Sequence, residues 1–453
     1  MGFKEDFIWG AATAAYQIEG GALQDGRGLS VWDEFSHTPG KTRLGDHGDY
    51  ACDSYNRMEE DIAILKELGM KAYRFSISWP RIIPNGTGAV NSKGIAYYDR
   101  LINALIKNNI TPFVTLFHWD YPLELYYKGG WLNPDSPKWF AEYVKVVVDH
   151  FSDRVQYWVT QNEPECYIGL GHELGLHAPG LQLPRKQVVR AWHYNLMAHG
   201  LAVKAIRENA KLKPYIGVVS CGDVPIPATD SIEDREVAIR AMFNKIDGPD
   251  LYLSFGDLLD PVILGKYPDR IIPYLPLNYE KDMDTIAQPL DFVGLNIYYG
   301  SYVKYDEKQG CIRQEEIPGS AETSLGWKVE PKSLYWGPKM VIDRYNLPVY
   351  ITENGLANND WISLDGKVHD PQRIDFINRY LKELHRLSEE GYKDKLAGYF
   401  HWSLLDNFEW AEGYTKRFGL VYVDYSTYKR TIKDSGYYFK KVIESNGNIC
   451  LNM

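Results

Sequence analysis

Two glutamates of this chain lie at the ends of apolar segments, in positions that suit catalysis by paired carboxyl groups. Glu163 follows segment 157–162 within Thr-Gln-Asn-Glu-Pro, and Glu353 ends segment 348–353 within Ile-Thr-Glu-Asn-Gly. Two carboxyl groups about 5–5.5 Å apart can cleave a glycosidic bond with retention of configuration, because one attacks the anomeric carbon while the other protonates the leaving oxygen. These residue types therefore indicate glycoside hydrolysis as a candidate chemistry.

The more common role of a glutamate is to cap a helix or to pair with a surface lysine. Both of these glutamates end segments that should be buried, where an unpaired charge is costly. Each therefore needs a charged or hydrogen-bonding partner, and Arg74 in segment 71–79 can serve one of them. The residues alone do not say which glutamate is the acid and which is the nucleophile.

An alternation of apolar and amphipathic segments along the whole chain must position these glutamates. Eight apolar segments predict strands at 8–15, 71–79, 111–119, 157–162, 215–221, 291–299, 348–353 and 396–403. Apolar residues at spacings of three and four predict helices between them, including 55–68, 95–108, 137–151, 188–209 and 372–390. Eight strand–helix units predict an α/β fold, a (β/α)8 or TIM barrel, formed by one domain over 1–453.

Long stretches that we predict to be irregular interrupt this alternation at 19–53, 169–186, 225–260 and 302–331. Loops of such length usually build a site, so we expect long βα-loop insertions. A barrel places its active site at the carboxyl ends of its strands. The polar and aromatic residues expected there are Gln17, Arg74, His118, Trp119, Asn162, Glu163, Asn296, Tyr298, Glu353, Asn354 and Trp402.

The charge balance excludes some partners. A net charge of −10, with no basic run, argues against nucleic acid or an anionic membrane as a partner. No run is apolar and long enough to span a membrane, and the first residues contain no apolar signal region, so we expect a cytoplasmic protein. We predict a small-molecule partner, and the sequence does not indicate an oligomeric state.

The cysteines and histidines indicate neither a disulfide framework nor a metal site. The five cysteines are odd in number and widely scattered, which is typical of reduced thiols: Cys52, Cys166, Cys221, Cys311 and Cys450. The histidines lack the His-Glu-x-x-His spacing, and Cys-x-x-Cys is also absent. We therefore predict no metal ion and no cofactor.

Seven segments, in this order, resemble glycoside hydrolase family 1 and its β-glucosidase-like members across essentially the whole chain. They are FIWGAATAAYQIEG (7–20), YRFSISWPR (73–81), LFHWD (116–120), TQNEP (160–164), GLNIYY (294–299), ITENG (351–355) and DNFEW (406–410). A lone Asn-Glu-Pro is weak evidence, but seven motifs on predicted strand ends are specific.

This resemblance implies a retaining β-glycosidase that hydrolyses terminal β-D-glucosyl residues, and also β-D-galactosyl and β-D-fucosyl residues, through a covalent glycosyl-enzyme. The small-molecule partner that it implies is a β-glucoside or oligosaccharide. It implies that Glu163 is the acid/base and Glu353 the nucleophile. Arg74 and the Tyr298 hydroxyl should then keep Glu353 ionised, while burial and a nearby negative charge should raise the pKa of Glu163 toward about 6–7.

The resemblance also implies which residues contact the sugar. Those expected around the glycone are Gln17, His118, Trp119, Asn162, Glu409 and Trp410. Asn162 should bind the 2-hydroxyl, Gln17 and His118 the 3- and 4-hydroxyls, and Glu409 the 4- and 6-hydroxyls as a charged acceptor. We expect Trp402 to form the stacking floor, Trp327 to lie beneath the leaving group, and Asn296 to support the glutamates.

Three other functions remain open. In the 6-phospho-β-glycosidase branch, segment 408–418 resembles a phosphate clamp, but here Glu409 would repel phosphate, although Lys416 and Arg417 are close in sequence. A transglycosylase would use the same intermediate. A non-catalytic sugar-binding relative would characteristically have lost one of the two glutamates.

The chain departs from the family's pattern at one position. Glu165 follows Asn-Glu-Pro, where the family commonly has Trp, and Cys166 comes next. A Glu165 that faced the cleft would alter the aglycone preference or the pKa of the acid/base, whereas one that faced outward would simply be solvated.

Overall fold

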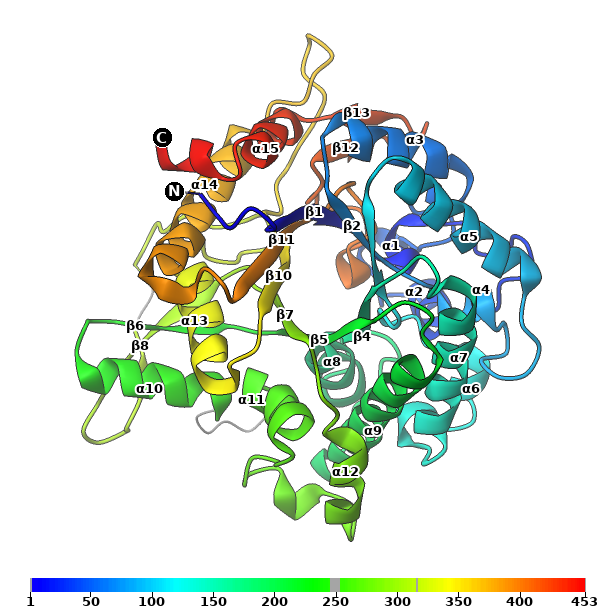
Figure 1. The fold of residues 1–453 in the computed structure, drawn as a ribbon, viewed down its shortest axis with the longest axis horizontal. Helices are drawn as coiled ribbons and strands as arrows, with labels where there is room; N and C mark the ends of the chain where they lie inside the picture. The colour runs from blue at the N-terminus through cyan, green and yellow to red at the C-terminus, as the bar shows by residue number, and fades with distance from the viewer. Residues whose placement is uncertain (1, 245–252, 315–316, 453) are drawn as a thin grey trace.

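A closed barrel of eight parallel strands forms the centre of the computed structural model, which describes residues 2–244, 253–314 and 317–452 (Figure 1). The strands are β1 (Ile8–Ala12), β2 (Ala72–Ser76), β3 (Thr111–Thr115), β4 (Tyr157–Asn162), β5 (Tyr215–Cys221), β7 (Phe292–Asn296), β10 (Val349–Asn354) and β11 (Leu396–Trp402). They follow one another around the barrel in chain order, and β11 pairs with β1 to close it. All eight predicted strands are confirmed.

Several strands are shorter than predicted at their carboxyl ends. The apolar segment 111–119 continues four residues beyond β3, and segment 71–79 continues three residues beyond β2. Of these extra residues, Trp79 begins a helix, whereas His118 and Trp119 line a pocket at the carboxyl ends of the strands. Hydrophobicity alone does not show at which residue a strand ends within a longer apolar segment.

Helices surround the barrel as an outer ring (Figure 1). The longer ones are α3 (Ser54–Glu67), α5 (Ser92–Lys107), α7 (Ser136–Phe151), α9 (Arg185–Asn209), α13 (Ser333–Tyr345), α14 (Pro371–Leu387) and α15 (Asp434–Glu444). In α5 the buried residues Tyr97, Tyr98, Leu101, Ile102 and Leu105 recur at helical spacing, so one apolar face packs inward. The predicted helices between the strands are confirmed to within a few residues.

The βα loops contain more regular structure than the sequence predicted. They hold the helices α1 (Ala15–Ile18), α2 (Val31–His37), α4 (Trp79–Ile82), α6 (Leu123–Tyr126), α8 (Pro164–Ile168), α10 (Ile232–Phe243), α11 (Phe255–Leu259) and α12 (Met283–Ile286). They also hold a three-stranded sheet of β6 (Val224–Pro227), β8 (Gly300–Lys304) and β9 (Ile312–Arg313), and a hairpin of β12 (Val421–Val423) and β13 (Arg430–Ile432).

The prediction of irregular structure over 225–260 and 302–331 was therefore wrong in part. Strand β6 pairs with β8, which is more than 70 residues away in sequence, so no local sequence pattern could have predicted the pairing. Residues 245–252 and 315–316 of these stretches lie outside the described residues.

Aromatic side chains fill the interior of the barrel below its mouth. The ring of Phe113 packs against those of Phe292, Tyr350 and Phe400, with ring centroids 5.5, 5.4 and 5.0 Å apart. Because these rings fill the interior, the place for a pocket in the barrel is above them, at the carboxyl ends of the strands. Among the described residues, no helix combines the length and the apolar character needed to cross a membrane.

Candidate active site

A pocket of about 660 Å³ opens at the carboxyl ends of the barrel strands. Ten of the residues predicted from the sequence line it: His118, Trp119, Glu163, Asn296, Tyr298, Trp327, Glu353, Trp402, Glu409 and Trp410. The two glutamates thus face one cavity from β4 and β10, as the strand order of the barrel requires.

Glu353 is held by a cation and a hydroxyl. Arg74 Nη1 donates to Glu353 Oε1 at 2.6 Å, and the Tyr298 hydroxyl donates to Oε2 at 2.7 Å. Burial raises the pKa of Glu353 above its ordinary value, while the Arg74 charge and the Tyr298 hydrogen bond oppose that rise. These partners favour an ionised carboxylate, and they are the two that the sequence predicted.

Glu163 has different surroundings. It lies at the turn between β4 and α8, with a left-handed φ of 50°. Asn296 Nδ2 donates to its Oε1 at 2.6 Å, and no ion pair to Glu163 occurs among the described residues. Burial, and then the negative charge of Glu353, raise its pKa to about 8. The predicted direction is confirmed: burial and the charge of Glu353 outweigh the hydrogen bonds from Asn296 and Cys166 and the charge of Arg74, which lower the pKa.

Aromatic rings form the wall of the pocket beside these carboxyl groups. The rings of Trp119 and Trp410 stack at 4.4 Å, and those of His118 and Trp402 at 6.1 Å. Both Trp119 and Trp410 have a positive φ, 79° and 49°, a backbone conformation that residues other than glycine rarely adopt. Such rings offer flat apolar faces to a ligand that stacks on them.

Glu409 lies among these rings and has a raised pKa. Its Oε2 atom is enclosed and has no hydrogen-bond partner among the described residues. Burial, followed by the charges of Glu353 and Glu163, raises the pKa of Glu409 to about 8. Burial and the neighbouring carboxyl groups therefore oppose the negative charge expected of Glu409.

Three predicted site residues lie behind the lining. Gln17 Nε2 donates to Asn407 Oδ1 at 3.0 Å and to the Phe408 carbonyl at 2.9 Å. Asn162 Oδ1 accepts from Arg74 at 2.5 Å and from Asn296 at 3.1 Å, and Asn162 Nδ2 donates to His118 Nε2 at 3.2 Å. Arg74 and Asn162 thus hold residues that face the cavity, whereas Gln17 contacts the segment just before Glu409.

Glu165 faces inward. It is buried, it lines the pocket, and its Oε1 accepts a hydrogen bond from the Ser220 hydroxyl. Burial raises the pKa of Glu165 well above its ordinary value. Of the two orientations left open by the sequence, the solvated one is thereby excluded.

Sequence reasoning missed a pair of thiols next to Glu165. Cys166 Sγ lies 3.4 Å from Cys221 Sγ, and both residues line the pocket. All five cysteines are free, as predicted. Because 55 residues separate the two, only their positions just after β4 and at the end of β5 could have suggested that they meet.

The basic residues of segment 408–418 are engaged away from the pocket. Lys416 donates to the Ser324 carbonyl, and Arg417 pairs with Asp406 at 2.7 Å. The described lining contains one lysine, Lys41, and no arginine. Segment 408–418 therefore contributes no basic side chain to the described lining that could clamp a phosphate.

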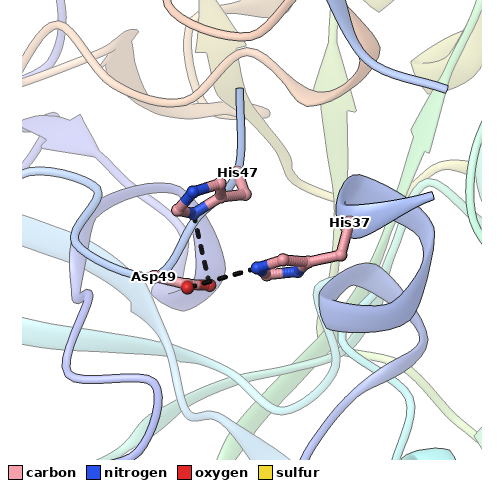
Figure 2. Close-up of side chains that lie close together, drawn as sticks. All are labelled: His37, His47 and Asp49. Carbon is pink, nitrogen blue, oxygen red and sulfur yellow. Dashed lines mark hydrogen bonds and ion pairs between the residues drawn. The ribbon is translucent and has the colours of Figure 1, made fainter. Parts of the chain in front are cut away.

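Two groups of side chains among the described residues have the spacing of metal ligands. One is Glu163, Cys166 and Cys221 in the pocket. The other is His37, His47 and Asp49, near the surface, where both imidazoles point toward the carboxylate (Figure 2). His37 Nε2 lies 3.2 Å and His47 Nδ1 3.4 Å from Asp49 oxygens. The sequence prediction of no metal site considered short spacings only.

Comparison with known proteins agrees with this geometry. The model of glycosyl hydrolase family 1 matches residues 1–448. The chain is 49% identical to a 1,4-beta-D-glucan glucohydrolase of Thermotoga neapolitana, over 98% of this chain and 99% of the relative. It is 45% identical to beta-glucosidase A of Acetivibrio thermocellus, with the same coverage of both chains.

Solved structures show the same likeness. The beta-glucosidase from Thermotoga maritima in complex with glucoimidazole is 48% identical and matches with a TM-score of 0.90, covering 98% of this chain and 99% of that one. The match to the family model, these identities and the shared barrel show the same relationship. The chain belongs to family 1 of the glycosyl hydrolases.

Proposed function

We propose that this enzyme is a retaining β-glycosidase that hydrolyses terminal, non-reducing β-D-glucosyl residues, and also β-D-galactosyl and β-D-fucosyl residues. The observation that carries the proposal is the unequal environment of two carboxyl groups in one pocket. Glu353 contacts Arg74 and Tyr298, whereas Glu163 contacts a neutral amide and has a pKa of about 8. One group is suited to attack and the other to donate a proton.

In the first step, Glu353 attacks the anomeric carbon. The bond from that carbon to the leaving oxygen breaks, a bond to a Glu353 oxygen forms, and the Glu163 proton passes to the leaving oxygen. The ester at Glu353 carries no charge, so the electrostatic cause that raises the pKa of Glu163 disappears. Glu163 then accepts a proton from water, which attacks the anomeric carbon and releases Glu353.

Unpartnered polar atoms support a sugar beside these carboxyl groups. Gln17 Oε1, His118 Nδ1 and Glu409 Oε2 are enclosed without a hydrogen-bond partner. Buried polar groups are normally satisfied, so the atoms of His118 and Glu409 in the pocket lining, with that of Gln17 behind it, favour a ligand rich in hydroxyls. We assign Gln17 and His118 to the 3- and 4-hydroxyls, Glu409 to the 4- and 6-hydroxyls, and Asn162 to the 2-hydroxyl.

The rings divide the pocket into two parts. Trp119, Trp402 and Trp410 lie with His118, so they belong to the glycone side, with Trp402 as the stacking floor. Trp327 packs against Tyr298 and Tyr299 and belongs beneath the leaving group. The substrates that fit are small β-glucosides and β-linked oligosaccharides, including those from cellulose, which agrees with the names of the relatives.

We further propose that residues 1–453 act as one catalytic domain in the cytoplasm. The family match across 1–448 supports the first part, and the five free thiols support the second.

The test of the proposed function is rescue of a nucleophile variant. Glu353→Ala should abolish turnover of an aryl β-glucoside, and added azide should restore it by giving the α-glucosyl azide, because the small anion attacks from the emptied side. The β-glucosyl azide as the rescue product would reject Glu353 as the nucleophile.

A further inference from the structure

The wall of the pocket beside Glu163 carries two thiols that hydrolysis does not use. Cys166 lies in α8, three residues after Glu163, and Cys221 is the last residue of β5. Their sulfurs are 3.4 Å apart, and one ligand atom from each of Glu163, Cys166 and Cys221 lies within 4.8 Å of the others. Three potential ligands therefore converge at one point of the cavity.

The spacing suits a single four-coordinate cation. Zinc–thiolate bonds are about 2.3 Å long, which places two sulfurs of a tetrahedral site about 3.7 Å apart. The observed separation of 3.4 Å needs only a small adjustment. Two sulfurs, one carboxylate oxygen and a water from the open pocket would complete the coordination, and thiolates select Zn²⁺ and Cd²⁺ over Mg²⁺ and Ca²⁺.

The ligands stand on segments that are already tied together. Glu165 precedes Cys166, Ser220 precedes Cys221, and the Ser220 hydroxyl donates to Glu165 Oε1. Asn296 holds Glu163 from a third strand at 2.6 Å. The approach of the two thiols is thus supported by neighbouring contacts, so binding requires little ordering of the chain.

We propose that thiophilic divalent cations bind to Glu163, Cys166 and Cys221 and inhibit the enzyme by occupying its acid/base. Binding forms two metal–sulfur bonds and one metal–oxygen bond, and the protons of the two thiols and of Glu163 pass to solvent. The binding stands on the geometry alone, whereas the inhibition rests on the proposed role of Glu163.

Cadmium is the probe, because its bonds to thiolate give an ultraviolet charge-transfer band that bonds to imidazole do not. The enzyme is reduced, freed of reductant, and its free thiols are counted before the titration. Binding is followed by that band and by calorimetry, and inhibition is measured relative to the uninhibited activity of each variant. The variants are Cys166→Ser, Cys221→Ser and His47→Ala.

His47→Ala is the matched control because it removes a ligand of the second metal-like group, which contains no sulfur (Figure 2). We expect wild type and His47→Ala to show the band and to be inhibited alike. Each Cys→Ser variant should lose the band and need at least about tenfold more cadmium for half-inhibition. Equal cadmium sensitivity of wild type and both Cys→Ser variants would overturn the site.

A second measurement separates the site from the role of Glu163. With cadmium bound, kcat/KM should fall much further for methyl β-glucoside than for 2,4-dinitrophenyl β-glucoside, which needs little help from an acid. Equal loss on both substrates, with thiol-dependent binding intact, would contradict inhibition through the acid/base. Failure of the binding itself would leave the proposed glycosidase function untouched.

Discussion

Arg74 Nη1 donates a hydrogen bond to Glu353 Oε1 at 2.6 Å, which joins the second strand of the barrel to the seventh across its interior. Arg74 is fully buried, and its other terminal nitrogen donates to Asn162 Oδ1 at 2.5 Å. One guanidinium therefore gives Glu353 its counter-charge and also orients Asn162, so the charge and the geometry of the site depend on the same side chain.

Replacing Arg74 by Met should lower kcat/KM on an aryl β-glucoside by at least about 100-fold, since a preorganised charge partner is lost. The pKa of Glu353 should also rise, because burial would no longer be opposed by a cation. An ionised nucleophile is needed, so the acid limb of the kcat/KM profile should move to higher pH. Arg74→Lys, which keeps the charge, should move that limb less, and a limb that stays in place in Arg74→Met would count against this role.

The basic limb of the wild-type kcat/KM profile should report Glu163. Its pKa of about 8 means that the proton required by the leaving group is present below that pH and is lost as pH rises through it. We expect activity on methyl β-glucoside to fall above about pH 8. A basic limb that persisted in Glu163→Gln would assign it to another group.

Glu163→Ala should separate substrates by their leaving groups. For methyl β-glucoside, kcat/KM should fall by about 10²–10⁴-fold, the usual contribution of a general acid. For 2,4-dinitrophenyl β-glucoside, kcat/KM should fall by less than about tenfold while kcat drops, because deglycosylation loses its base. Similar losses of kcat/KM on both substrates would be inconsistent with an acid/base role.

A 6-phospho-β-glucoside should be a poor substrate. Glu163, Glu165, Glu353 and Glu409 line the pocket, and Lys416 and Arg417 are engaged elsewhere. We expect kcat/KM for an aryl 6-phospho-β-glucoside to be at least about 100-fold below that of the unphosphorylated glucoside, because the described lining offers one lysine and no arginine to balance a buried phosphate charge. A preference for the phosphorylated substrate would refute the assignment of Glu409 to the 6-hydroxyl.

Glu165 should make stability depend on pH. Burial raises the pKa of Glu165 in the folded state. Folding therefore favours the protonated form. The stability that this form contributes is present below the pKa of the unfolded chain, about 4.3, and is lost as pH rises from there through the higher pKa of the folded protein. Glu165→Gln keeps an acceptor for Ser220 without the charge. The difference in free energy of unfolding between Glu165→Gln and wild type should grow in favour of the variant by up to about 1.4 kcal/mol per pH unit between those two pKa values.

Thermal unfolding of wild type and Glu165→Gln from pH 4 to pH 8 measures this effect. The exposed Glu5→Gln serves as the control for the exchange of Glu for Gln itself. A constant difference between wild type and Glu165→Gln would show that Glu165 ionises as easily in the folded protein as in the unfolded chain.

Much of this site could be predicted from local patterns. The eight strands were predictable because each is a short apolar run between amphipathic helices, and barrel topology then places the residue after β4 and the end of β10 at one mouth. The family resemblance, and not the strand pattern, assigned Arg74 and Tyr298 to Glu353, and the structure confirms both contacts. The parallel barrel leaves few alternatives once its strands are known.

What the sequence by itself determined, then, is the barrel and the set of residues at its mouth. Only the tertiary structure decided that Cys166 meets Cys221, that Glu165 turns inward to Ser220, and that Gln17 stands behind the lining. It also decided the raised pKa of Glu409, because burial and the neighbouring carboxyl groups oppose the charge expected of that residue. Periodicity reports which face of a segment is buried, but contacts between distant loops and the desolvation of a charge depend on every element packed around them.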